Sequence, residues 1–172
     1  PEGVAPDFLS VLNTVKSGKR AVSSQDAIGH MTSVSDSANE FKRKVRTLIR
    51  GMTALFREAE LLNPFRYPLF AFFLLSHKVM RWLVPLFLLV ALGTNFFLLD
   101  KAIYQLSLVG QVVFYGTATL AILSGEIAGR FTLARVAEYF CVANGAILVA
   151  WVRYLSGARQ EIWGPTKRAP QD

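Results

Sequence analysis

The chain has few acidic residues, few charged residues of any kind and a single cysteine. Of its 172 residues 18% are charged, against about a quarter in an ordinary soluble domain, and 52% are hydrophobic. The single cysteine, Cys141, lies in an apolar stretch, which excludes a disulfide framework. Lys and Arg outnumber Asp and Glu by 19 to 12, for a formal net charge of +7. Such a composition is typical of a membrane protein whose cations lie at the lipid headgroups.

Common site signatures are missing as well. The sequence has no Walker loop, no Gly-x-Gly-x-x-Gly and no Gly-x-Ser-x-Gly. The two histidines, His30 and His77, are far apart and have no cysteine at ligand spacing, so we expect no zinc site. The chain begins at Pro1 without a signal-peptide pattern, and we expect it to be the carboxy-terminal part of a longer protein.

Residues 1–39 have the composition of soluble or surface-bound structure. Apolar residues from Phe8 to Val15 recur at helical spacing, and Gly18 stands where such a helix would end. Residues 20–23 follow that turn and suit a short strand. Asp7 directly precedes the apolar helix, where an aspartate is a good helix cap.

A basic run, "EFKRKVRTLIRGM", occupies residues 40–52 and precedes a strongly apolar region. Opposite most of its cations, apolar residues follow one helical face: Val45, Leu48, Ile49, Met52, Leu55, Phe56, Ala59 and Leu62. A nucleic-acid arm would come with a soluble fold or stacking aromatics, and a solvated helix face would not need the apolar stripe. The pattern instead favours a helix in the headgroup layer of an anionic bilayer, and we expect no nucleic-acid partner.

Three further helices are expected next. Asn63-Pro64 should end the basic helix, and the apolar run 69–75 is too short to span and suits a second interfacial helix. Residues 40–80 are thus predicted to form interfacial amphipathic helices, and residues 81–155 a transmembrane region. Within it, residues 82–99 and 103–123 are spanning candidates joined by a tight Asp100-Lys101 turn.

The last apolar stretch, residues 136–152, has two interpretations. It contains Glu138 and an Asn144-Gly145 pair, so it either spans or forms two short helices that dip into the bilayer. A third crossing would place the basic tail 156–172 outside, against positive-inside bias. We therefore favour two spans and a cytoplasmic tail, in a multi-pass protein of the inner or plasma membrane.

The order of elements resembles a known family. "APDFLSVLNTVKSGKRAVSSQDAIGH", "EFKRKVRTLIRGM" and "LLNPFRYPLFAFFLLSHKVMRWLVP" are similar to the end of a membrane-integrated family 2 glycosyltransferase, a group that includes hyaluronan, chitin and cellulose synthases and bacterial exopolysaccharide transferases. The resemblance covers nearly the whole chain. It implies that residues 1–39 are the acceptor-side end of an α/β GT-A catalytic domain, followed by the interfacial and transmembrane helices of a mainly α fragment.

The resemblance also implies an activity and its partners. A nucleotide-sugar would be the donor, with Mg or Mn bound by the upstream part of the protein, and a polysaccharide or lipid-linked molecule on the cytoplasmic side would be the acceptor. The family's acceptor-side aspartate, often one of an acidic pair, matches Asp7. Its carboxylate would take the proton of the attacking hydroxyl in an inverting transfer. Here Pro6 replaces the first acid of the pair, and helix capping remains the alternative role.

Other residues match the family in part. The basic helix stands where processive synthases carry Gln-x-x-Arg-Trp, but this chain has neither the glutamine nor the tryptophan, which favours addition of one or a few sugars. Arg46 and Arg50 are candidates for the donor diphosphate or, equally, for lipid phosphates. "IWGPTKR" resembles a gating loop in which Trp163, Thr166 and Arg168 would close over the nucleotide. An aromatic-belt tryptophan beside snorkelling cations is the alternative.

Two other classes of function are open at this level. The chain could be a non-enzymatic membrane anchor or channel subunit for a partner transferase. A small transporter is disfavoured, because the first two spanning candidates contain no ionisable residue for an ion pathway. The identity of the sugar donor, the acceptor, the linkage and the processivity does not follow from the sequence.

Overall fold

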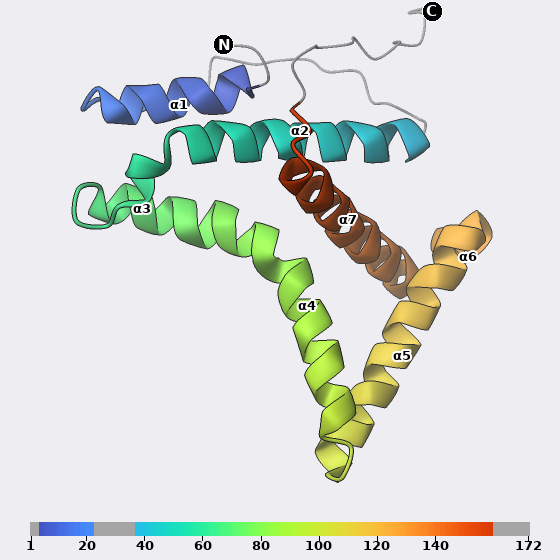
Figure 1. Ribbon diagram of the computed structural model, residues 1–172. Coiled ribbons are helices and arrows are strands. Elements are labelled where there is room, and N and C mark those ends of the chain that lie inside the picture. Colours follow the sequence, from blue (N-terminus) through green and yellow to red (C-terminus); the bar gives the residue numbers. More distant parts are fainter. Residues whose placement is uncertain (1–3, 23–36, 160–172) are drawn as a thin grey trace, which may run out of the picture. The chain divides into compact units, whose positions relative to one another are not determined.

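The computed structural model describes residues 4–22 and 37–159, and every regular element within these ranges is a helix (Figure 1). The mainly α fold class is therefore confirmed. The strand expected at residues 20–23 is wrong for the part that is described, since residues 20–22 have no regular structure. A strand needs a partner for its backbone N–H and C=O groups, and the described ranges contain no second strand to pair with.

The chain divides into two compact units. One comprises Pro1–Lys78 and Val149–Asp172, and the other comprises Val79–Leu148. The predicted site residues Asp7, Arg46 and Arg50 belong to the first unit. The second unit holds most of the long apolar helices.

Helix α1, Pro6–Lys16, opens the first unit. Proline at the first helical position has its φ angle preset for a helix, and Gly18, at a φ of 76°, accepts the left-handed turn that ends it. Asp7 in the first turn and Lys16 in the last turn both interact favourably with the helix dipole. The helix buries Leu9 and Leu12 on one face.

Helix α2, Ser37–Arg57, packs against α1 and carries the predicted apolar stripe. Val45, Ile49, Met52 and Leu55 on this stripe are at most 2% exposed. We expected the stripe to face lipid, and that expectation is wrong for these residues, because protein covers them. They form the core of the first unit, and burying side chains of this size contributes about 1.5–3 kcal/mol each.

The chain leaves α2 earlier than predicted. The α-helix ends at Arg57, and a 3-10 turn, η1 (Ala59–Leu62), carries the chain to Asn63. There the side-chain Oδ1 of Asn63 accepts a hydrogen bond of 2.9 Å from the N–H of Phe65, which is an Asx turn. Asn63-Pro64 therefore ends the helical path, as predicted, but the last turn before it is 3-10.

Helix α3, Pro68–Leu74, was expected to be a separate short helix, and this is wrong. A π-helical turn, η2 (Leu75–Val79), joins it to α4 (Met80–Phe97), so that helix is continuous over the 30 residues Pro68–Phe97. The polar residues Ser76, His77 and Lys78 looked like a break in the sequence. The π-turn accommodates them because it keeps backbone hydrogen bonds while adding a residue to the turn.

The second unit is built on a hairpin of α4 and α5 (Ala102–Leu123). The turn falls at Asp100-Lys101, as predicted. Asn95 of α4 is 4% exposed, and its side-chain amide forms a hydrogen bond of 3.1 Å with the side-chain amide of Gln111 in α5. This polar contact joins the two helices of the hairpin.

A short helix, α6 (Gly125–Arg130), leads to α7 (Thr132–Leu155). The alternative of two short helices within residues 136–152 is wrong, because α7 is one helix of 24 residues. Asn144 does not interrupt it, since its Nδ2 donates to the carbonyl of Phe140 one turn earlier, at 2.8 Å. The Asn144-Gly145 pair is thus accommodated inside the helix.

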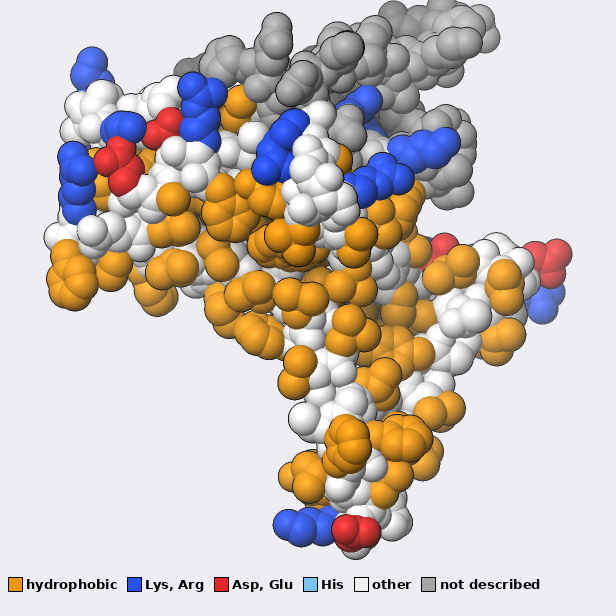
Figure 2. Space-filling model, in the orientation of Figure 1, with side chains coloured by type: hydrophobic (Ala, Val, Ile, Leu, Met, Phe, Trp, Pro, Cys, Tyr) orange, Lys and Arg blue, Asp and Glu red, His pale blue; other side chains and the backbone are white. Residues whose placement is uncertain are grey.

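Three helical segments within the described chain are long and apolar enough to cross a membrane: Pro68–Phe97, Ala102–Leu123 and Thr132–Leu155. Hydrophobic side chains cover the visible faces of α4 and α5, and charged ones stand at their hairpin end (Figure 2). Between 11% and 28% of the most apolar part of each segment is buried within the chain. Exposed apolar faces of this extent favour contact with lipid or with other membrane helices.

Candidate functional site

The start of α1 presents Asp7 to solvent. The helix cap is Ala5, Pro6 is the first helical residue and Asp7 is the second. Since the cap position is occupied by Ala5 and Asp7 lies inside the first turn, the alternative in which Asp7 is the cap residue is wrong. Its backbone carbonyl accepts a hydrogen bond of 2.7 Å from the Ser10 hydroxyl, and its side chain is exposed. The carboxylate is therefore available to an approaching hydroxyl.

Arg50 of α2 holds the segment that leads into α1. Its Nε and Nη2 both donate to the carbonyl oxygen of Val4, at 3.1 and 2.6 Å. The Val4 side chain is 3% exposed and belongs to the core. Hydrogen bonds from a charged guanidinium are stronger than those between neutral groups, and two of them to one oxygen also fix the orientation of that carbonyl. Arg50 thus fixes the chain just before Asp7, which is a role that the sequence did not reveal.

Arg46 lies one helical turn before Arg50, on the same side of α2, and is partly exposed. The structure therefore brings Arg46 and Arg50 onto one face. Their proposed contact with a diphosphate stays a prediction.

In the same run, the Arg43 guanidinium makes two hydrogen bonds to the Glu40 carboxylate, at 2.7 and 2.8 Å, which lowers the pKa of Glu40. Arg43 is thereby engaged within its own helix.

The other end of α1 is tied down by an ion-pair cluster. The Lys16 ammonium lies 2.6 Å from Glu60 Oε1 and 2.9 Å from Glu58 Oε2, and the second oxygen of Glu60 is 3.0 Å from Arg66. Contact with Glu60 and then Glu58 raises the pKa of Lys16, and the hydrogen bond from Lys16 lowers the pKa of Glu60. The cluster links α1 to the 3-10 turn after α2.

A cation also reaches the first turn of α1 from the helix that leaves this unit. The Lys78 ammonium, in the π-turn η2, lies 4.5 Å from the centroid of the Phe8 ring. Phe8 directly follows Asp7. The sequence carries no signal for this contact, because Phe8 and Lys78 are distant in sequence.

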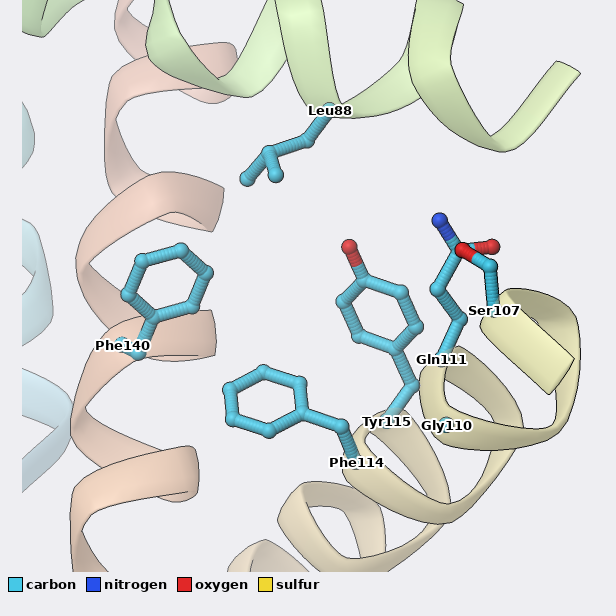
Figure 3. A pocket seen from close by; sticks show the side chains of 7 residues that line it. All are labelled: Leu88, Ser107, Gly110, Gln111, Phe114, Tyr115 and Phe140. Atoms are coloured by element: carbon cyan, nitrogen blue, oxygen red, sulfur yellow. The ribbon is translucent and has the colours of Figure 1, made fainter. Parts of the chain in front are cut away.

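The second unit contains a cavity of about 360 Å³ between its helices (Figure 3). It is lined by Leu88 of α4, Phe140 of α7 and five residues of α5: Ser107, Gly110, Gln111, Phe114 and Tyr115. The rings of Phe114 and Phe140 meet edge to face at 5.6 Å. The sequence signal for this cavity is the spacing of a hydroxyl, an amide and a phenol four residues apart on α5, at Ser107, Gln111 and Tyr115. These seven residues provide hydrogen bonds and aromatic faces but include no carboxylate, imidazole or amine.

Three predicted residues, Trp163, Thr166 and Arg168, lie outside the described residues. The metal expected from the resemblance was assigned to another part of the protein. Within the described residues no group of three or more His, Cys, Asp or Glu side chains is placed to hold a metal ion.

Comparison with known proteins finds no match for this chain among protein-family models, curated proteins or solved structures.

Proposed function

We propose that this chain is the acceptor-side and membrane portion of an inverting family 2 glycosyltransferase. The proposal starts from the sequence resemblance. The observation that supports it most is the placing of Asp7: an exposed carboxylate in the first turn of α1, beside a segment held by Arg50, in the unit from which a long apolar helix departs. A carboxylate in such a position can act as the general base of a transfer to an acceptor hydroxyl.

In the proposed reaction the Asp7 carboxylate is the general base. It removes the proton of an acceptor hydroxyl while that oxygen bonds to the anomeric carbon of the donor sugar. The bond between the anomeric carbon and the nucleotide diphosphate breaks as the new bond forms, and the configuration inverts. The diphosphate leaves with the electron pair, and the proton stays on Asp7 until solvent removes it. Arg46 is the proposed contact for the departing diphosphate.

The membrane part of the proposal is a multi-pass protein with its catalytic side in the cytoplasm. The three apolar helices support insertion. The Phe56 ring of α2 lies 6.1 Å from the Trp151 ring and 5.6 Å from the Tyr154 ring, both near the end of α7. The end of α7 therefore lies beside α2.

The test is sugar transfer by membranes that contain the intact protein. Each of a panel of radiolabelled UDP-, GDP- and dTDP-sugars is supplied, and label is followed into the lipid and polymer fractions. We expect one donor to be used, with release of its nucleoside diphosphate in equal amount. The alternative, a non-enzymatic anchor or channel subunit, predicts no transfer from any donor by the purified and correctly inserted protein, and that result would overturn the proposal.

A further inference from the structure

The first turn of α1 is held by cations on both sides of Asp7. Before it, Arg50 binds the carbonyl of Val4 at 2.6 and 3.1 Å. After it, the ammonium of Lys78 lies 4.5 Å from the centroid of the Phe8 ring, which is within the range of a cation–π interaction. Arg50 comes from the core helix α2, and Lys78 comes from the π-turn that leads into the first long apolar helix.

The π-turn explains how Lys78 reaches this position. A π-turn holds one more residue than an α-turn, so the side chains after it are rotated relative to the preceding helix. The turn is supported by its own side chains: Ser76 Oγ donates to the Phe72 carbonyl at 2.7 Å and lies 2.8 Å from His77 Nδ1. His77 packs edge-on against Phe73, with ring centroids 6.0 Å apart. This arrangement orients Lys78 toward α1.

We propose that Lys78 is a positioning residue, which fixes the direction of the Asp7 carboxylate through its contact with the Phe8 ring. The proposal rests on the proposed function and adds to it a link between the membrane-entry helix and the base. A general base must stand within hydrogen-bond reach of the proton it takes, and a small displacement lowers the rate steeply. A residue that sets the first turn of α1 therefore acts on turnover without touching substrate.

The competing role for Lys78 is a contact with lipid phosphates, since a lysine at a membrane entry extends its ammonium toward the headgroups. Arg81, which is exposed and stands one turn further along the same helix, is the matched residue for that role. A lipid role predicts similar losses on replacing either residue. The positioning role predicts a loss at Lys78 alone.

The test compares four variants of the intact protein in the same bilayer: Lys78→Met, Lys78→Arg, Phe8→Leu and Arg81→Met. We expect Lys78→Met to lower kcat by roughly ten- to a hundredfold with the donor KM nearly unchanged. Lys78→Arg keeps a cation over the ring and should restore most of the rate. Phe8→Leu should match Lys78→Met, and the two changes together should cost little more than either one. Arg81→Met should leave kcat near the wild-type value.

A double-mutant cycle with Asp7 separates the two claims. If Lys78 acts through Asp7, Lys78→Met should cost almost nothing in an Asp7→Asn background. Normal kcat in Lys78→Met, or a full additional loss in the Asp7→Asn background, would overturn the positioning role. Normal turnover in Asp7→Asn would instead overturn the proposed function. Independently of activity, amide hydrogen exchange at Leu9, whose N–H donates to the Ala5 carbonyl at 2.9 Å, should accelerate in Lys78→Met and not in Lys78→Arg. Unchanged exchange at Leu9 in Lys78→Met would show that the contact does not hold this turn.

Discussion

The guanidinium of Arg50 binds the carbonyl oxygen of Val4 through two N–H groups, at 2.6 and 3.1 Å, across 46 positions of sequence. The contact joins the middle of α2 to the chain just before α1. It therefore links the basic run of the sequence to the position of the proposed base. Replacing Arg50 should therefore mainly lower the stability of the first unit, whatever its effect on a contact with phosphate.

Arg50→Gln is expected to lower stability by about 1–3 kcal/mol, because the carbonyl of the buried residue Val4 loses its charged donors. The measurement is the thermal unfolding midpoint of the intact protein in one detergent. Arg57→Gln is the matched control, since Arg57 is exposed at the end of the same helix, and it should change stability by about 0.5 kcal/mol or less. Equal shifts in the two variants would contradict a structural role for Arg50.

The cluster of Lys16 and Glu60 should make stability depend on pH in a defined direction. The pKa of Glu60 is lowered in the folded protein, so its contribution is present above the ordinary carboxyl value of 4.5 and is lost as the pH falls through the folded value. The pKa of Lys16 is raised, so its contribution is present below 10.5 and is lost only at higher pH. At neutral pH both contributions are present.

The check is the difference in unfolding midpoint between the wild type and Glu60→Gln. We expect the wild type to be the more stable at pH 7, with the difference closing as the pH falls below about 4.5 and shrinking in high salt. Glu126→Gln, in the short helix α6, is the control and should show no such trend. A difference that persists at pH 3 would show that Glu60 acts by packing rather than by charge.

Asn95 and Gln111 should stabilise the hairpin of α4 and α5. Interhelical hydrogen bonds between membrane helices contribute roughly 0.6–2 kcal/mol, and Asn95→Leu should cost that amount in a denaturation titration of the membrane-inserted protein. Thr94→Val is the neighbouring control, because the Thr94 hydroxyl bonds only within its own helix, to the Val90 and Ala91 carbonyls. A larger loss of stability in Thr94→Val than in Asn95→Leu would contradict a stabilising role for the amide pair.

The rings of Phe56, Trp151 and Tyr154 bring the end of α7 beside α2. We therefore expect the two helix ends to lie on the same side of the membrane, and positive-inside bias predicts that this is the cytoplasmic side. With Cys141 replaced by Ala, one cysteine at Gln171 should react with a membrane-impermeant reagent only after lysis. Labelling in intact cells would establish an odd number of crossings and exclude the gating-loop role of Trp163, Thr166 and Arg168.

Much of the local structure was predictable from the sequence, and most of the long-range contacts were not. The apolar spacing from Phe8 to Val15, with Gly18 after it, predicted α1, and Asp100-Lys101 predicted the hairpin because charged residues leave an apolar segment there. The apolar face of α2 was also visible. Its covering by protein was not, because periodicity says which residues are buried but not what buries them.

The candidate site shows the same difference between local structure, which the sequence indicates, and long-range contacts, which it does not. Asp7 is a candidate base through the family resemblance, but its two supports depend on pairs that are distant in sequence. The partner of Arg50 is a backbone carbonyl, which every residue has, so no sequence pattern marks Val4. The partner of Lys78 depends on a π-turn, and the polar run Ser76-His77-Lys78 looks like the end of a helix rather than its continuation.

The most direct test of the account is the turnover of Asp7→Asn in the intact protein. The substitution keeps the shape of the side chain and removes its ability to take a proton, so kcat should fall by roughly 10²–10⁴-fold while donor affinity stays near normal. Asp100→Asn, in the exposed hairpin turn, is the matched control and should keep full activity. Wild-type turnover in Asp7→Asn, in an assay limited by the chemical step, would contradict the assignment of Asp7 as the base.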